Sequence, residues 1–170
     1  PKIRGFDIAG RCVPANHVGG DFFQYFELPD NRLVICMADV TGHAMQAAIP
    51  SVMFSGILDT QIQANIPLEN LLLELNRSLY RNLDKRTFVC LTIGELDPKA
   101  HTLRLSNCAC PYPYHFRAAK ADLVELKMDA YPLGIRPDTS YQFLKVGLEP
   151  GDRIVFCSDG IVEATNAKED

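Results

Sequence analysis

Three aspartates lie beside or close to glycine where an apolar segment meets a turn. They are Asp21 after Gly19-Gly20, Asp39 before Val40-Thr41-Gly42, and Asp159 before Gly160. A carboxylate next to a buried strand is costly unless a metal ion, a helix N-terminus or a hydrogen-bonded turn compensates its charge. Three such aspartates indicate one oxygen-lined site assembled from distant parts of the chain.

Carboxylates of this kind are hard oxygen donors, and they suit Mg²⁺ or Mn²⁺, which prefer carboxylates, backbone carbonyls and water. The flanking glycines let the backbone come close enough for a carbonyl, such as that of Gly20 or Val40, to join the shell. Two such ions roughly 3.5–4 Å apart can hold a hydroxide nucleophile and clamp a phosphoryl group. The pattern favours a phosphoester hydrolase, while ordinary turn chemistry is the alternative for each aspartate taken alone.

The segments around these aspartates predict an α+β domain dominated by antiparallel hairpins, with helices packed outside. We expect strands at 3–13, 22–28, 33–39, 88–96, 102–108, 114–117, 123–127, 141–146 and 154–158. The last of these strands leads into Asp159. The segment 29–32 has the composition of a hairpin turn. The strands it joins would be antiparallel neighbours, with Asp21 and Asp39 at the same end of the sheet.

Helical periodicity occupies the middle of the chain. Between 45 and 64 it gives a predicted apolar stripe at positions 49, 52, 53, 56, 57 and 62, and Pro50 should kink this helix or mark where its regular part begins. A second helix over 68–83 has leucines at 71, 72, 75, 79 and 83, and a third should begin at 161. The first two helices should together cover one face of a sheet.

Composition narrows the class of protein. The 170 residues fit one domain, and the formal net charge of −4 argues against a nucleic-acid partner. The sequence has no apolar stretch of transmembrane length and no signal peptide, so we expect a cytoplasmic domain without direct membrane contact. The six cysteines should be reduced thiols, mostly buried. Because the sequence begins with Pro1 and stops just after residues 163–170, we expect a fragment of a longer protein that lacks its C-terminal elements.

The sequence lacks the motifs of several other enzyme and binding-site classes. The sequence contains no thiolate phosphatase loop, P-loop, dinucleotide fingerprint, zinc protease helix or nucleophile elbow. Cys108-Ala-Cys110 is spaced too closely for a zinc knuckle, which favours buried thiols. His17, His101 and His115 are predicted in loops or on the surface. His43 follows the Asp39 turn, where it would be either a hydrogen-bond donor or proton shuttle beside the site, or a helix-start residue that packs locally.

Several motifs, in order, resemble one family. They are Pro14-Ala15-x-x-Val18-Gly19-Gly20-Asp21, Asp39-Val40-Thr41-Gly42-His43, Leu96-Asp97-Pro98, Pro132-Leu133-Gly134, Pro150-Gly151-Asp152 and Ser158-Asp159-Gly160-Ile161-Val162-Glu163-Ala164. This set resembles the bacterial branch of the PPM, or type two C, metal-dependent serine/threonine protein phosphatases. Within it, the chain is similar to the SpoIIE-like group, which includes regulators of stress-response sigma factors.

The resemblance implies a sandwich of two antiparallel sheets with flanking helices and a site for two Mn²⁺ or Mg²⁺ ions. Asp39 would bridge the ions, and the Val40 carbonyl, Asp21 and Asp159 would complete the ligands, with Gly20, Gly42, His43 and Gly160 supporting them. A metal-bound hydroxide would attack phosphoserine or phosphothreonine of a protein in signal transduction, such as a small anti-anti-sigma-type regulator. An upstream sensory or receiver domain is implied, and a homodimer is compatible with this branch.

Three positions depart from the family pattern. Gln24 replaces a frequent aspartate, Ala44 replaces the glycine after His43, and Cys110 stands where a histidine is common. The last metal-ligating aspartate of the family would lie beyond Asp170. The alternative function is therefore a catalytically weak or inactive partner-binding module of the same fold.

Overall fold

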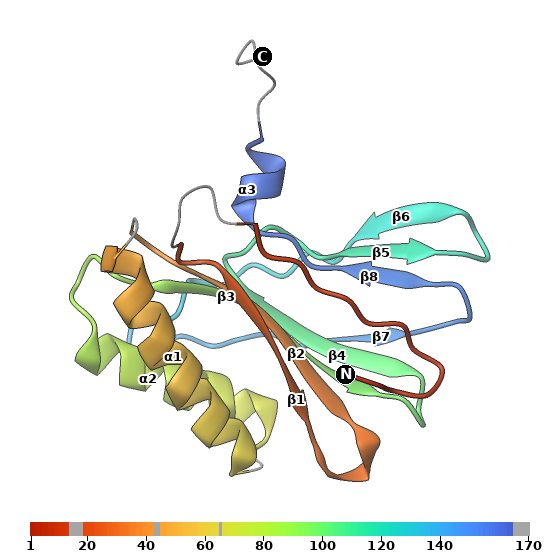
Figure 1. Ribbon diagram of the computed structural model, residues 1–170, viewed down its shortest axis with the longest axis horizontal. Coiled ribbons are helices and arrows are strands. Elements are labelled where there is room, and N and C mark those ends of the chain that lie inside the picture. The colour runs from red at the N-terminus through yellow and green to blue at the C-terminus, as the bar shows by residue number, and fades with distance from the viewer. Residues whose placement is uncertain (14–18, 43–44, 65, 165–170) are drawn as a thin grey trace.

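Two antiparallel sheets form the framework of the protein (Figure 1). The computed structural model describes residues 1–13, 19–42, 45–64 and 66–164. The first sheet has the strand order β1-β2-β3-β4-β7 and the second the order β6-β5-β8. The strands are β1 (Phe22–Glu27), β2 (Leu33–Val40), β3 (Val89–Asp97), β4 (Thr102–Cys108), β5 (Tyr114–Arg117), β6 (Asp122–Glu125), β7 (Leu144–Gly147) and β8 (Arg153–Val155). The predicted α+β sandwich with flanking helices is confirmed.

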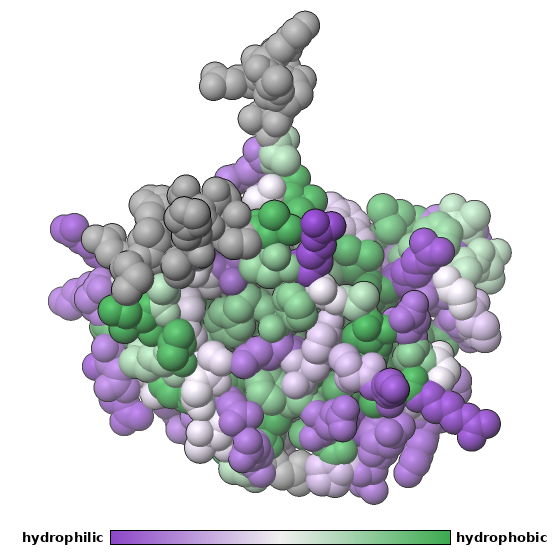
Figure 2. Space-filling view, in the orientation of Figure 1, coloured by the Kyte–Doolittle hydropathy of each residue, from purple (hydrophilic) through white to green (hydrophobic). Residues whose placement is uncertain are grey.

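Helices α1 (Met45–Gln63) and α2 (Leu68–Asn82) cover one face of the five-stranded sheet, as predicted (Figure 1). The apolar stripe predicted for α1 is wrong in part, because Ile49 and Val52 are 67% and 74% exposed. Figure 2 shows hydrophobic surface over this helix. The face of α1 that meets the sheet contains Ala47, Ser51, Phe54, Leu58 and Ile62. The helix runs through Pro50, and none of the described helices is long and apolar enough to span a membrane.

A second apolar core fills the space between the two sheets. It contains Leu33, Leu96, Leu103, Leu105 and Val146 of the first sheet and Leu126 and Met128 of the segment after β6. The partly buried Ile154 of β8, in the second sheet, packs against it. Ile3 is buried in the same core. The strand predicted for 3–13 is wrong, because among these residues only the isolated bridge between Ile3 and Phe6 pairs. Their apolar alternation reflects packing over this core and not membership of a sheet.

The hairpin that carries the first two aspartates forms as predicted. A short 3-10 turn (Pro29–Asn31) joins β1 to β2, and Phe22 pairs with Ala38 in their antiparallel register. Asp21 and Asp39 therefore lie at the same end of the sheet. On the other side of β2, Asp39 pairs with Cys90 of β3.

The surroundings of Asp159 differ from the prediction. The strand β8 ends at Val155, and Asp159 is the first residue of the short helix α3 (Asp159–Val162). The preceding strand is also shifted, since β7 covers 144–147 in place of 141–146. Cys157, between β8 and α3, is buried, so the apolar run continues as an irregular packed segment. The structure therefore contains one aspartate inside a strand, one before a strand and one at a helix start.

Candidate metal centre

The three aspartates meet at one end of the first sheet. One carboxylate oxygen from each of Asp21, Asp39 and Asp159 lies within 4.8 Å of the other two. Asp21 and Asp39 are partly buried and Asp159 is exposed. They come from the start of β1, the end of β2 and the start of α3, which are far apart in sequence. Carboxylates gathered at this distance could share a divalent cation.

Gly20 allows the backbone to approach this cluster. A Cβ atom at position 20 would overlap the carbonyl oxygen of Val40 and would lie 3.2 Å from Oδ1 of Asp39. Only glycine fits this contact without moving the backbone. The structure therefore places the Val40 carbonyl beside the cluster. Gly42 has a φ of +120°, a conformation that favours glycine, and Gly160 follows Asp159 in α3.

The cluster concentrates negative charge in a partly buried place. The pKa of Asp39 is raised to about 7, first by burial and then by its hydrogen bond with Asp21 and the charges of Asp21 and Asp159. A like-charge cluster of this kind is stabilised by a bound cation, which offsets the repulsion and the desolvation. The all-oxygen donor set fits Mg²⁺ or Mn²⁺ and offers no soft ligand.

Helix α1 holds the segment that contains Asp21. Ser51 Oγ lies 3.1 Å from the carbonyl oxygen of Gly20 and 2.7 Å from that of Ala47. One helical turn later, Gln24 Nε2 donates to Ser55 Oγ over 2.7 Å. These contacts are not apparent from the sequence, although two serines four residues apart on a helix share a face. Gln24, one of the departures from the family pattern, therefore bonds to α1.

Thr41 fixes the segment on the other side of Val40. Its backbone N donates to the carbonyl oxygen of Phe88 over 3.1 Å, and Phe88 N donates to Thr41 Oγ1 over 3.0 Å. These bonds join the Asp39 turn to the loop 83–88 that leads into β3. The positions of Val40 and of this loop are thus coupled.

The burial of the cysteines agrees with the prediction that most of them are buried thiols. All six are free, and four of them are buried, with Cys12 exposed and Cys90 half-buried. Burial raises the pKa of the Cys110 thiol, and Asn107 Nδ2 donates to the Cys110 carbonyl over 2.8 Å. Within the described ranges, only the aspartate cluster brings three metal-binding side chains together, so Cys108 and Cys110 form no such group there.

The histidines give a mixed result. His17 and His43 lie outside the described residues, so both alternatives for His43, a donor or proton shuttle beside the site and a helix-start residue that packs locally, stay predictions. His101 is exposed in a turn, as predicted. The prediction for His115 is wrong: it lies in β5 with a side chain only 8% exposed, and its Nε2 is 2.9 Å from Oδ2 of Asp152. Asp152, the buried partner of His115, lies far from it in the sequence, so the local sequence around His115 gave no sign that the histidine is internal.

Comparisons with known proteins agree with this architecture. The family model described as Stage II sporulation protein E (SpoIIE) matches residues 29–170. The phosphoserine phosphatase RsbU of Bacillus subtilis is 26% identical over 163 residues, which cover 96% of this chain and 48% of RsbU. The chain thus spans about half the length of this curated relative.

Solved structures give the same fold. A crystal structure of RsbU and RsbW domains from Mycobacterium tuberculosis aligns with a TM-score of 0.78 and 26% identity, covering 91% of this chain and 42% of the other. The PP2C phosphatase domain of SpoIIE from Bacillus subtilis aligns with a TM-score of 0.77, covering 87% of this chain and 43% of that one. Its identity of 18% supports the fold alone.

Proposed function

The chain belongs to the SpoIIE family of PP2C-type phosphatase domains, and from this membership we propose that it hydrolyses phosphoserine or phosphothreonine in a protein. The observation that carries the proposal is the convergence of Asp21, Asp39 and Asp159. The name of RsbU, a phosphoserine phosphatase, supports the same reaction class. We further propose a cytoplasmic signalling protein as substrate, in the manner of a small anti-anti-sigma-type regulator.

Asp21, Asp39, Asp159 and the Val40 carbonyl would hold two Mn²⁺ or Mg²⁺ ions. When bound, such ions act as Lewis acids that lower the pKa of water and neutralise phosphoryl charge. Asp39 interacts with both other carboxylates, through a hydrogen bond with Asp21 and through the charges of Asp21 and Asp159. Gly20 lets Val40 approach, and Ser51 and Thr41 hold the segments on either side. Gly42, Gly160 and His43 would support these ligands from their neighbouring positions.

Substitution of Asp39 tests the proposal. With Mn²⁺ added, the protein that contains this domain should hydrolyse a phosphoserine peptide and p-nitrophenyl phosphate, and Asp39→Asn should reduce both rates by at least about 100-fold, as expected when a metal ligand is lost. Asp7→Asn, which removes an exposed carboxylate, is the matched control. Activity that survives Asp39→Asn would contradict the assignment.

A second candidate is a partner-binding module without turnover. Two observations favour it: the Gln24 amide is engaged by Ser55, and Cys110 is a buried thiol of raised pKa where the family often has histidine. If the protein with Mn²⁺ binds a phosphoserine peptide but releases no phosphate over hours, this second candidate replaces the first. A homodimer and an upstream sensory or receiver domain remain part of either proposal.

A further inference from the structure

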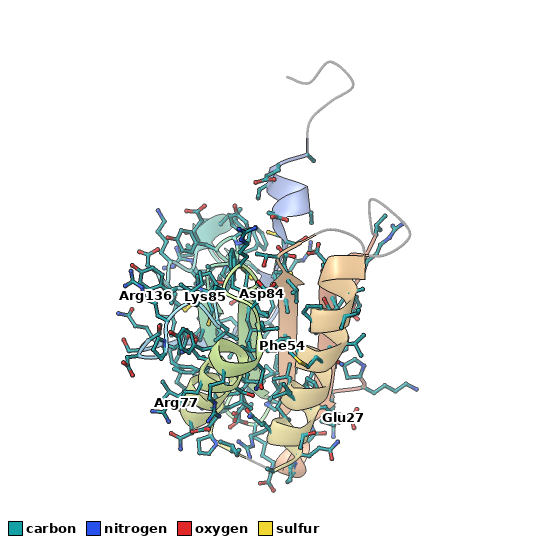
Figure 3. The ribbon with its side chains drawn as sticks, turned by 90° about the vertical axis from the view of Figure 1, so that its left-hand side faces the viewer. Glu27, Phe54, Arg77, Asp84, Lys85 and Arg136 are labelled. Atoms are coloured by element: carbon teal, nitrogen blue, oxygen red, sulfur yellow. The ribbon has the colours of Figure 1, made fainter. Side chains whose placement is uncertain are left out.

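A basic surface lies next to the candidate metal centre. It consists of four exposed cations: Arg81 in the last turn of α2, Lys85 and Arg86 in the loop 83–88, and Arg136 in the loop 131–137. In Figure 3, Lys85 and Arg136 lie on the same side of the molecule. The whole chain carries a formal net charge of −4, so this cluster of positive charge is opposite in sign to the net charge of the protein.

The two loops of this basic surface are held by α2 and β3. Asn76, fully buried in α2, donates to the carbonyl oxygen of Arg136 over 2.7 Å and accepts from Gly134 N over 2.9 Å. Val89 and Leu133 exchange two backbone hydrogen bonds of 3.0 and 2.8 Å. The cations are therefore presented on a fixed backbone, which lowers the ordering cost of binding a partner.

The basic surface is continuous with the segment that carries Asp39. Thr41, the second residue after Asp39, has its Oγ1 3.4 Å from the carbonyl oxygen of Arg86. If the phosphorylated residue of a substrate bound at the three aspartates, the substrate residues next to it would thus lie beside the loop 83–88.

The charges of this surface are available to a partner. In the part of the chain that the structure describes, none of the four cations has a carboxylate oxygen within 4.0 Å. Two carboxylates share the surface, Asp84 and the exposed Asp138. Asp84 is engaged by its own loop, since it accepts from Arg86 N over 2.8 Å. The Arg136 guanidinium lies 4.1 Å from the centre of the Tyr131 ring, a stacking that leaves its N–H edge open.

We propose that the basic surface docks an acidic segment of the phosphoprotein substrate, adjacent to the phosphorylated residue. The inference rests on the proposed phosphatase function and specifies the substrate class of the same site. Carboxylates on the substrate would be steered to the surface, and arginine forks would bind them with defined geometry. The docking increases the affinity for the substrate and aligns its phosphorylated residue with the candidate metal centre, while hydrolysis itself depends on the aspartates.

Kinetics with matched peptides test this docking. Two phosphoserine peptides, one flanked by Asp and Glu and one by Ser and Gln, are compared in the Mn²⁺-loaded protein. We expect kcat/KM to be about 10-fold higher for the acidic peptide, mainly through KM, with the advantage falling as NaCl rises from about 50 to about 300 mM. The combined variant K85E/R86E/R136E should lose this preference and change p-nitrophenyl phosphate hydrolysis by less than about twofold.

The control K99E/K120E/K145E makes the same charge change at exposed lysines of the β3–β4 turn, the β5–β6 turn and β7. It should keep the preference for the acidic peptide. The proposal is overturned if K85E/R86E/R136E keeps the preference, if both combined variants lose it equally, or if single-stranded DNA competes as strongly as the acidic peptide.

Binding separates this proposal from the phosphatase function. The fluorescence anisotropy of the labelled acidic phosphopeptide is measured on wild type and on both combined variants. If wild type hydrolyses nothing but binds the peptide through these cations, the docking stands and the phosphatase function fails. If wild type hydrolyses both peptides equally well, the phosphatase function stands and the docking fails.

Discussion

Ser51 Oγ lies 3.1 Å from the carbonyl oxygen of Gly20, and this contact ties the second turn of α1 to the residue before Asp21. The hydroxyl is buried, and it also lies within hydrogen-bonding distance of the Ala47 carbonyl. A shift of α1 along the sheet would therefore change the position of the Asp21 carboxylate. The Ser51 hydroxyl therefore links α1 to the candidate metal centre, in addition to the bond between Gln24 and Ser55.

The variant Ser51→Ala should weaken Mn²⁺ binding, because Gly20 loses the contact that holds it against α1. We expect a loss of about 1 kcal/mol, or roughly fivefold in affinity, as for one hydrogen bond. Titration of Mn²⁺ followed by electron paramagnetic resonance measures this without relying on turnover. Thr60→Ala removes a similar hydroxyl contact, to Gly56 in the exposed part of α1, and should leave the affinity unchanged. Equal effects of the two substitutions would refute the linkage.

The variant Gly20→Ala should be more damaging, because its Cβ would overlap the Val40 carbonyl oxygen. Relief of this overlap must move β1 or the Asp39 turn, at a cost of about 1–3 kcal/mol in the free energy of unfolding. Gly56→Ala is the matched control, since a Cβ there meets nothing within 4 Å and a helical alanine should stabilise by about 0.5–1 kcal/mol. Urea denaturation of both variants gives the comparison. Stabilities that change in the same direction would contradict the close approach at Gly20.

Local patterns explain what could be predicted of this fold. The alternation of 22–28 and 33–39 and the turn between them are short-range features, so the hairpin, and with it the position of Asp21 and Asp39 at the same end of the sheet, followed from the sequence. The leucine periodicity of α2 likewise identified its buried face. The motifs around Asp159 predicted a metal ligand, and the structure places this residue near Asp21 and Asp39 even though the predicted strand does not reach it.

The wrong predictions concern contacts between distant segments. Residues 3–13 alternate like a strand but have no partner strand there, since Ile3 packs into the core between the sheets. The exposure of Ile49 and Val52 depends on where the sheet meets α1, which periodicity alone does not determine. His115 is internal, where its ring bonds to Asp152, 37 residues later in the chain. Tertiary partners of this kind are not encoded in local spacing.

The metal-free protein should lose stability as the pH rises. The pKa of Asp39 is raised to about 7 in the folded state, against about 4 in the unfolded chain. The protonated form is thus favoured by folding, so its stabilising contribution is complete below pH 4 and is lost as the pH rises to 7 and above. In EDTA, Asp39→Asn should therefore be more stable than wild type at pH 8, by about 2 kcal/mol, since solvent screens the half-buried carboxylate.

Thermal melting in EDTA from pH 5 to pH 8 measures this difference, with Asp7→Asn as the control. Addition of Mn²⁺ should raise the melting temperature of wild type at pH 8 and should have a smaller effect on Asp39→Asn, because a ligand that binds the folded state stabilises it. A wild-type protein whose metal-free melting temperature is flat over this range would show that the carboxylates do not repel one another.

A low pH should weaken the contact that Asp152, in the turn before β8, makes with His115 of β5. Asp152, only 5% exposed, accepts hydrogen bonds from Ala118 N, Glu149 N and His115 Nε2, at 2.9, 3.1 and 2.9 Å. The two backbone N–H groups, followed by His115, lower the pKa of Asp152 to about 2. A depressed folded pKa contributes stability that is complete above about pH 4 and is lost as the pH falls towards 2.

The variant Asp152→Asn should therefore be less stable than wild type at pH 6, and the gap should narrow between pH 4 and pH 2. The asparagine keeps the shape of the side chain but presents one acceptor oxygen to three donors, so part of the cluster is left unsatisfied. Urea denaturation followed by circular dichroism at pH 6, 4, 3 and 2 measures the gap, and Asp7→Asn should run parallel to wild type throughout. A gap that stays constant down to pH 2 would mean that the carboxylate charge of Asp152 does not stabilise the fold.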